Sequence, residues 1–291
     1  VVVIPVALTF LLRFWQRSDA DSDVKTLVAM TVTLPRQTER SPQQSNEALK
    51  TFQDYIAPME QFFSSLTTII HQRSLVDWLF STPAHVSFEL TSVGGVISFV
   101  IVCPKRIQQI VERQLQSFYP TAEVTAGVPP LLFNKATPAI AGVVMEQAKN
   151  FILPIKTYRH LEADPLQGLS NALTKLQDGA ASIQVMIRPT SESWRTHTNI
   201  ASNHVMNNKL HLVNRTKFGR VVGVVGEVVR PTPASEQPKG LSGEQEALIK
   251  ALQEKGSKTG FETIIRIVST GDTTDAAELN TKQLISAFSQ F

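Results

Sequence analysis

The chain has 291 residues, enough for two domains of ordinary size, and its 42% hydrophobic and 18% charged residues describe a folded protein rather than a disordered tail. The formal net charge of +3 is too small to indicate a nucleic-acid partner by itself. Cys103 is the only cysteine, which excludes an intramolecular disulfide and a multi-cysteine metal site and suits a reducing compartment. Because Cys103 follows an apolar run at 97–102, we interpret it as a buried structural thiol.

The chain opens on an apolar run, VVVIPVALTFLL. This run is shorter than the roughly 20 residues that cross a membrane, but Trp15 between Arg13 and Arg17 has the pattern of a membrane interface. We therefore predict that residues 1–17 are the C-terminal part of a transmembrane helix, with the soluble part of the chain in the cytoplasm. A signal-peptide core and a buried helix are the alternatives.

Residues 24–128 have the pattern of one α+β unit. The paired Gly94-Gly95 permits the positive φ angles of a tight turn and predicts a hairpin between two alternating strands. The expected elements are, in chain order, a strand at 25–34, a long helix from Ser41, strands at 85–91 and 96–102, a helix at 104–118 and a strand at 123–125. The order β-α-β-β-α-β is that of a ferredoxin-like, or split β-α-β, fold.

Residues 140–291 repeat this order with an interruption at 190–259. Asp164 is a good N-cap, and Pro165 suits the first turn of the helix that follows. The expected elements are a strand near 143–155, this helix, strands at 182–187 and 261–268, and a helix at 273–288. We expect this unit to be truncated at its C-terminus, because no closing strand follows. The predicted fold class is α+β, with two ferredoxin-like units in tandem after an N-terminal transmembrane segment.

The interruption at 190–259 contains the only marked charge asymmetry of the chain. Between Arg195 and Arg230 there are six Lys or Arg residues and one acid, Glu227. We take the six as candidate contacts to an anionic partner: Arg195, Lys209, Arg215, Lys217, Arg220 and Arg230. Three interpretations stay open, namely an ordinary solvated insertion, contact with lipid headgroups, and contact with nucleic acid.

No motif for catalysis or cofactor binding occurs in the chain. The patterns GxxxxGK[ST], GxSxG, CxxC and HExxH are all missing from the sequence. His197, His204 and His211 recur every seven residues, whereas helix ligands of one zinc ion usually lie four residues apart. We therefore predict no catalytic, cofactor-binding or metal-ligating residue, and no cofactor.

Several stretches of the sequence resemble a known family. The densest is PIKTYRHLEADPLQGLSNALTKLQDG at 154–179, which continues through IQVMIRP to Trp194. The others are FELTSVGGVISFVIVCPK at 88–105, QLQSFYPTAEV at 114–124, GFETIIRIV at 260–268 and AFSQF at 287–291. Together they are similar to the membrane-proximal N-terminal region of type IV secretion or conjugative-transfer-like ATPases, of the coupling-protein class, from uncultured bacteria. In such proteins a P-loop ATPase domain follows, so the resemblance carries over no ATP-binding residue.

We therefore predict a non-catalytic, membrane-anchored cytoplasmic domain that acts in assembly or substrate entry for such a motor. Its expected partners are the membrane, further copies of itself and other secretion-system subunits. The alternative is a single-stranded nucleic-acid-binding module that uses the basic insertion, with Phe88 and Phe99 as candidate stacking aromatics on the sheet. An enzyme is a third class, which would require a pocket with converging polar side chains.

Overall fold

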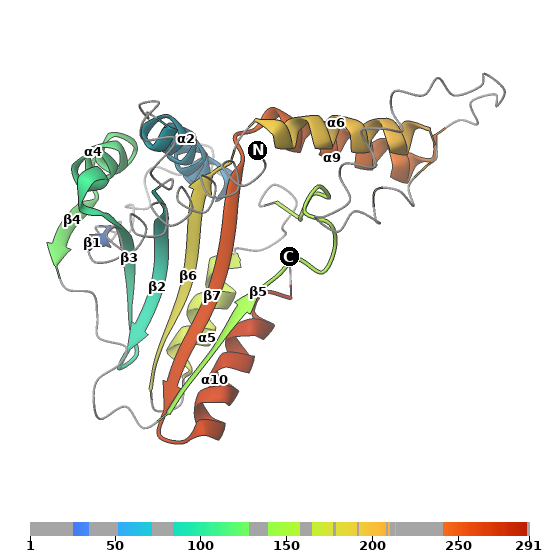
Figure 1. Cartoon of the computed structure of the whole chain (residues 1–291). Coiled ribbons are helices and arrows are strands. Elements are labelled where there is room, and N and C mark those ends of the chain that lie inside the picture. The colour runs from blue at the N-terminus through green and yellow to red at the C-terminus, as the bar shows by residue number, and fades with distance from the viewer. Residues whose placement is uncertain are drawn as a thin grey trace, which may run out of the picture. The chain divides into compact units, whose positions relative to one another are not determined.

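The computed structural model describes residues 26–34, 52–71, 84–127, 139–157, 165–176, 179–190, 192–207, 209, 213 and 241–289. Its main feature is a seven-stranded sheet in the order β4-β1-β3-β2-β6-β7-β5, in which all neighbours are antiparallel (Figure 1). The strands are β1 (Leu27–Thr33), β2 (Val86–Val93), β3 (Val96–Pro104), β4 (Glu123–Gly127), β5 (Ala139–Met145), β6 (Ala180–Pro189) and β7 (Phe261–Gly271). The chain is therefore an α+β protein, which confirms the predicted fold class at this level.

The chain divides into two compact units. The first, which we call the sheet unit, takes residues 1–145, 157–189 and 261–291 and contains all seven strands. The second, which we call the helical unit, takes residues 146–156 and 190–260. The described strands of both predicted repeats thus belong to one unit.

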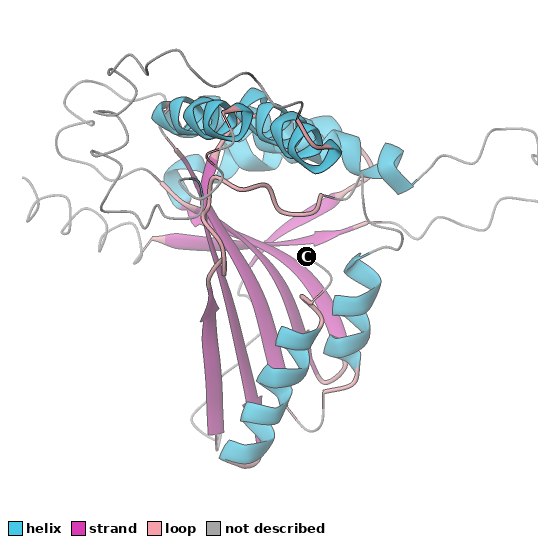
Figure 2. Ribbon diagram, turned by 90° about the vertical axis from the view of Figure 1, so that its right-hand side faces the viewer, coloured by secondary structure: helices cyan, strands magenta, loops and turns pink. Residues whose placement is uncertain are grey.

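The four α-helices that the structure describes in the sheet unit pack on one face of the sheet. They are α2 (Phe52–His71), α4 (Gln108–Phe118), α5 (Pro165–Thr174) and α10 (Thr274–Ser286), and a short 3-10 helix, η1 (Lys105–Ile107), precedes α4. The sheet is strongly twisted, as long antiparallel sheets are, and helices lie along its long strands (Figure 2). Because successive strand residues point to opposite faces, only every second residue of each strand meets these helices.

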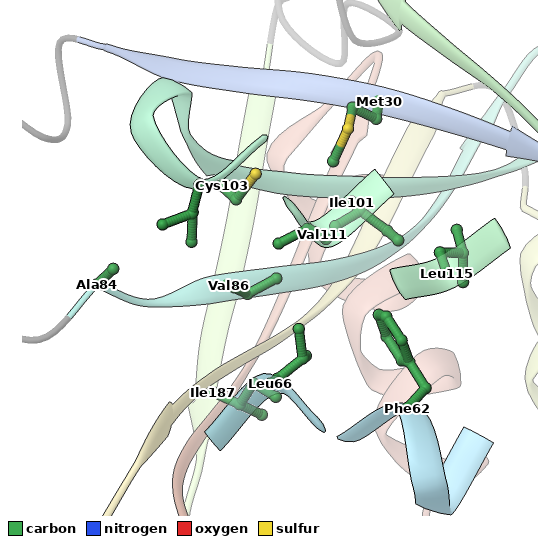
Figure 3. Packing of buried hydrophobic residues seen from close by; sticks show 11 residues of the cluster. Met30, Phe62, Leu66, Ala84, Val86, Ile101, Cys103, Val111, Leu115 and Ile187 are labelled. Atoms are coloured by element: carbon green, nitrogen blue, oxygen red, sulfur yellow. The ribbon is translucent and has the colours of Figure 1, made fainter. Parts of the chain in front are cut away.

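The core under α2 and α4 is built around Phe62. Its ring makes edge-on contacts with Phe88 of β2 and Phe118 of α4, with centroids 6.1 and 6.4 Å apart. Buried residues from four strands and both helices complete the cluster, among them Met30, Val86, Ile101, Val111, Leu115 and Ile187 (Figure 3). Burying each large apolar side chain contributes about 1.5–3 kcal/mol, so this cluster fixes the helices to the sheet.

A second core lies under α5 and α10. Its buried residues come from β2, β6, β7 and the two helices: Leu90, Leu173, Ala181, Ile183, Ile267 and Leu284. The N-cap of α10 is Thr273, whose side chain accepts a hydrogen bond from the Ala276 amide at 3.2 Å. Leu90 of β2 and Ile183 of β6 are direct cross-strand partners, so this second core spans the junction between the two halves of the sheet.

Two very different connections join the hairpin strands of the two halves. Between β2 and β3, Gly94 and Gly95 have φ of 57° and 79°, which confirms the predicted tight turn. Between β6 and β7 the chain instead passes through residues 190–260, yet Pro189 and Phe261 remain direct partners. The insertion therefore takes the place of a hairpin turn.

The described part of the helical unit contains two packed helices, α6 (Ser193–Met206) and α9 (Gly243–Ser257). Ser242 caps α9 in a reciprocal capping box with Gln245. Buried apolar residues from both helices, from the 146–156 segment and at position 213 form its core: Ile152, Ala201, Val205, Val213, Ile249 and Leu252. Lys255 fixes that segment, since its Nζ donates to the carbonyls of Phe151 and Leu153, and burial lowers its pKa.

The predicted strand near 143–155 is wrong in its position. The strand β5 runs over Ala139–Met145, and the residues after it belong to the helical unit. The reason is a local turn at Asn150, whose Oδ1 accepts from the Ile152 amide at 3.1 Å and whose Nδ2 donates to the Val213 carbonyl at 3.2 Å. The apolar Ile152 that suggested a continuing strand instead enters the core of the helical unit.

Other predictions fall on residues that the structure does not describe. They include the transmembrane segment at 1–17 and the start of the first long helix at Ser41. Within the described ranges, none of the helices has the length and hydrophobicity needed to cross a membrane.

Candidate functional site

The sheet unit presents one face to its helices and another face that these described helices do not cover. We call the second the helix-free face. On four neighbouring strands its members are Ser87, Glu89 and Thr91 (β2), Ser182, Gln184, Met186 and Arg188 (β6), Glu262, Ile264, Arg266 and Val268 (β7), and Ile140, Gly142 and Val144 (β5). The two buried clusters draw on the alternate positions of the same strands, so the sequence alternation itself separates the two faces.

A row of hydrogen bonds crosses three strands of the helix-free face. Glu89, Gln184 and Arg266 occupy directly opposite positions on β2, β6 and β7. Gln184 Nε2 donates to Glu89 Oε2 at 3.0 Å, and Arg266 Nε donates to Gln184 Oε1 at 2.6 Å. Ser87 Oγ adds a bond to Glu89 Oε1 at 3.0 Å. The buried amide of Gln184 therefore connects a carboxylate to a guanidinium that lies two strands, or about 10 Å, away.

A second charged pair lies on the same face. Arg188 and Glu262 are direct partners on β6 and β7, and Arg188 Nε donates to Glu262 Oε2 at 2.6 Å. Their side chains are 46% and 54% exposed. The two arginines and two glutamates of this part of the face cancel in charge, so it offers no positive field to a polyanion.

Half-exposed apolar side chains border these polar groups. Ile264 on β7 is 52% exposed, and Ile140 and Val144 on β5 are 55% and 56% exposed. Val144 is the direct partner of Arg266, so the apolar group adjoins the hydrogen-bonded row. A surface that mixes exposed apolar side chains with paired polar groups is typical of protein–protein contacts.

The candidate stacking aromatics do not lie on this face. Phe88 points into the core, where its ring is 5.1 Å from that of Phe63. Phe99 is 45% exposed, but the register places it on the helix side of β3, opposite Leu90. Among the described strands, no aromatic residue occupies the helix-free face. Base stacking on this face therefore has no support from the described residues.

The structure describes two of the six predicted anionic-partner contacts. Arg195 lies on α6, where its Nε is 2.9 Å from Glu192 Oε2 and its Nη2 donates to the Lys258 carbonyl at 3.3 Å. Lys209 is exposed. The other four, Arg215, Lys217, Arg220 and Arg230, lie outside the described residues. Whether the six come together stays a prediction, and Arg195 already uses its guanidinium in local contacts.

Cys103 is a structural thiol, as predicted. It lies on β3 in the core under α2 and α4, with no exposed surface. Burial raises its pKa from 9.0 to about 11, so the thiolate that acts as a nucleophile is disfavoured at neutral pH.

Sequence reasoning missed the hydrogen-bonded row. None of its residues is among the predicted site residues. The signal was the alternation of polar residues along each strand, as in Ser182-Ile183-Gln184, which marks a polar face. Which polar residues lie opposite one another depends on the strand order and register, and these become visible only in the folded sheet.

Comparisons with known proteins place the chain in a family. A search of curated proteins found no match. The family described as "Domain of unknown function (DUF8128)" matches residues 32–291, which include all of the described strands except the first part of β1. The chain therefore belongs to this family of domains of unknown function.

Proposed function

We propose that this chain is a non-catalytic assembly domain of a type IV secretion or conjugative-transfer-like motor, and that it docks protein partners through the helix-free face. The observation that carries the proposal is the exposed part of that face. Its exposed residues lie on β7, on β5 and at the end of β6, whereas Ser87 and Thr91 of β2 and Ser182 of β6 are buried. Its paired polar groups need no ligand to satisfy them, and its exposed apolar groups gain free energy when a partner covers them.

The same proposal includes two ferredoxin-like units in tandem. The order β4-β1-β3-β2 with antiparallel neighbours is the arrangement that a β-α-β-β-α-β chain adopts in the split β-α-β fold, which supports the first unit. The order β6-β7-β5 in the second half repeats three of the four strand positions of the first half. In chain order, α5 and α10 correspond to α2 and α4. Pairing of β2 with β6 then joins the two units edge to edge.

The proposed location is the cytoplasmic side of a membrane, with residues 1–17 as the anchor. The support comes from the sequence, namely the apolar run followed by Arg13, Trp15 and Arg17. Anchoring by one end would hold the domain beside other membrane-bound subunits and so raise their effective concentration. Its proposed partners are further copies of the chain and other subunits of the secretion system.

Two surface variants test the docking role in membranes of the native host. Ile264→Lys places a positive charge on the helix-free face, whereas Gln116→Lys adds the same charge to the exposed surface of α4. We expect Ile264→Lys to reduce the fraction of chain in high-mass complexes on native gels at least about threefold, because a lysine is costly to desolvate in a contact. Gln116→Lys should leave that fraction unchanged. Equal behaviour of the two variants would contradict the proposal.

Two further measurements address the competing functional classes. Hydrolysis of ATP by the purified chain alone would contradict a non-catalytic domain. Salt-sensitive binding of single-stranded DNA that disappears when Arg215, Lys217 and Arg220 are neutralised would instead favour the nucleic-acid-binding alternative. We expect neither result.

A further inference from the structure

Arg266 of β7 is an exposed arginine that has no carboxylate partner in the described part of the chain. Its Nε donates to Gln184 Oε1 at 2.6 Å, and among the described residues this is its only hydrogen bond. Arg188 on the same face is instead paired with Glu262. Because a guanidinium carries N–H donors on all three nitrogens, both terminal nitrogens of Arg266 keep their donors for solvent or for a ligand.

A chain of hydrogen bonds holds this guanidinium in place. Gln184 is buried, and its Nε2 donates to Glu89 Oε2 at 3.0 Å. Ser87 Oγ donates to the other carboxylate oxygen of Glu89, also at 3.0 Å. Because Gln184 lies between Glu89 and Arg266, the guanidinium is positioned without a carboxylate in direct contact with it. Part of the conformational freedom of Arg266 is therefore already lost in the free chain, and a ligand does not have to order it.

Apolar side chains border Arg266 on two sides. Ile264 lies on the same face of β7 and is 52% exposed, and Val144, the direct partner of Arg266 on β5, is 56% exposed. A partner that covers these two side chains also removes water from the guanidinium, and a charge-assisted hydrogen bond is stronger where water is excluded. A positioned arginine beside exposed apolar groups is typical of the residues that dominate binding between proteins.

We infer that Arg266 binds a carboxylate of the docked protein, carried by an Asp or Glu side chain with apolar residues beside it. This inference names the chemistry of the partner and rests on the proposed docking function. The terminal nitrogens donate parallel hydrogen bonds to both carboxylate oxygens, while apolar residues of the partner cover Ile264 and Val144. A nucleic-acid strand fits this place less well, because Arg188 is already paired with Glu262 and the described strands place no stacking aromatic on this face.

Photo-cross-linking of the full chain in membranes of the native host tests this inference. An apolar photoreactive amino acid at Ile264 reports contacts beside Arg266, and it is combined with Arg266→Gln, Arg266→Lys or Arg113→Gln. Arg113→Gln is the matched control, because it removes the same charge from an exposed arginine of α4. We expect the yield of protein adduct to fall at least about tenfold with Arg266→Gln and about threefold with Arg266→Lys, since lysine keeps the charge but lacks the planar fork. Arg113→Gln should leave the yield unchanged.

Charge reversal then identifies the carboxylate. Mass spectrometry of the digested adduct locates the partner peptide that is joined to residue 264, and this peptide should contain an Asp or a Glu. Arg266→Glu should lower the adduct yield at least about tenfold, and replacing that acidic residue of the partner by Arg should restore most of it. A merely structural role of Arg266 in the sheet would not give this rescue, because a change in the partner cannot repair the sheet.

The failure of this inference can be distinguished from the failure of docking. A protein adduct whose yield is unaffected by Arg266→Gln, a joined peptide without an acidic residue, or a reversed charge that restores nothing would overturn the inference and leave docking in place. An adduct to nucleic acid would also overturn it. Absence of any adduct from residue 264 would overturn docking and the inference together. If urea unfolding shows that Arg266→Gln does not fold, the comparison of Arg266→Lys with Arg113→Gln decides the result.

Discussion

Pro189 at the end of β6 and Phe261 at the start of β7 are direct cross-strand partners, although residues 190–260 lie between them in the chain. Beyond this pair, the amide of Thr190 donates to the carbonyl of Gly260 at 3.1 Å. The chain thus leaves and re-enters the sheet at one point, as it does at the Gly94-Gly95 turn. The ladder between β6 and β7 therefore continues past Pro189 and Phe261 and ends at the bond between Thr190 and Gly260.

The first prediction is that the sheet unit keeps its fold without this insertion. Replacing residues 191–259 by a two-residue Asn-Gly turn should leave cooperative unfolding intact, with a change in Tm below about 5 °C, because such turns match the twist of paired strands. Hydrogen exchange should show the amides of β6 and β7 as protected as in the native chain. Loss of protection in these two strands would mean that the helical unit is needed to hold the register.

The second prediction concerns the hydrogen-bonded row. Gln184→Leu deprives Glu89 of a donor and Arg266 of an acceptor, and the change is at a buried position. We expect the free energy of unfolding, measured in urea, to fall by about 1–3 kcal/mol. The control is Glu262→Gln, which weakens the half-exposed pair with Arg188 and should cost less than about 1 kcal/mol. Equal costs would show that the row contributes no more than a surface ion pair.

The third prediction is a pH dependence from Cys103. Its pKa is about 11 in the fold and near 9.0 in the unfolded chain, so above pH 9.0 unfolding releases a proton. The stability that follows from this difference is fully present below pH 9.0 and is lost as the pH rises to about 11. The native chain should therefore lose about 2 kcal/mol more than Cys103→Val over this window, measured by urea unfolding. Other groups titrate in both proteins and cancel; identical pH profiles would exclude the shift.

The fourth prediction concerns the close approach of Trp194 to Gly260 in the helical unit. A Cβ on Gly260 would lie 2.3 Å from Trp194 Nε1 and 2.8 Å from Thr190 Cγ2, so Gly260→Ala forces the indole to move. We expect a loss of about 1–3 kcal/mol and a shift in tryptophan fluorescence. Gly243→Ala is the control in the same unit, since nothing lies within 4 Å of its added Cβ. If both alanine variants behave alike, the Trp194 contact has no energetic role.

Sequence patterns predicted most elements of the sheet unit because each carries a local physical signal. Alternating residues marked β2, β3 and β6, and the paired glycines fixed the turn between β2 and β3. These signals lie within a few residues of the elements they specify, so one sequence is enough to read them.

Features that depend on contacts between residues far apart in the sequence could not be predicted from these local patterns. The apolar residues at 152–155 look like a continuing strand, but Ile152 is buried against residues far along the chain, such as Leu252. The row from Glu89 to Arg266 requires that β2, β6 and β7 be neighbours in a particular register. Pairing of β2 with β6 joins the two halves, and no local pattern encodes that edge-to-edge contact.

The most direct test of the central claim, that the helix-free face docks protein partners, is site-specific photo-cross-linking in membranes of the native host. A photoreactive amino acid is placed at Ile264 on the helix-free face or at Gln116 on α4, both of which are exposed positions. We predict discrete protein adducts from Ile264 and none, or far fewer, from Gln116. Adducts that form equally from both positions, or only from Gln116, would contradict it.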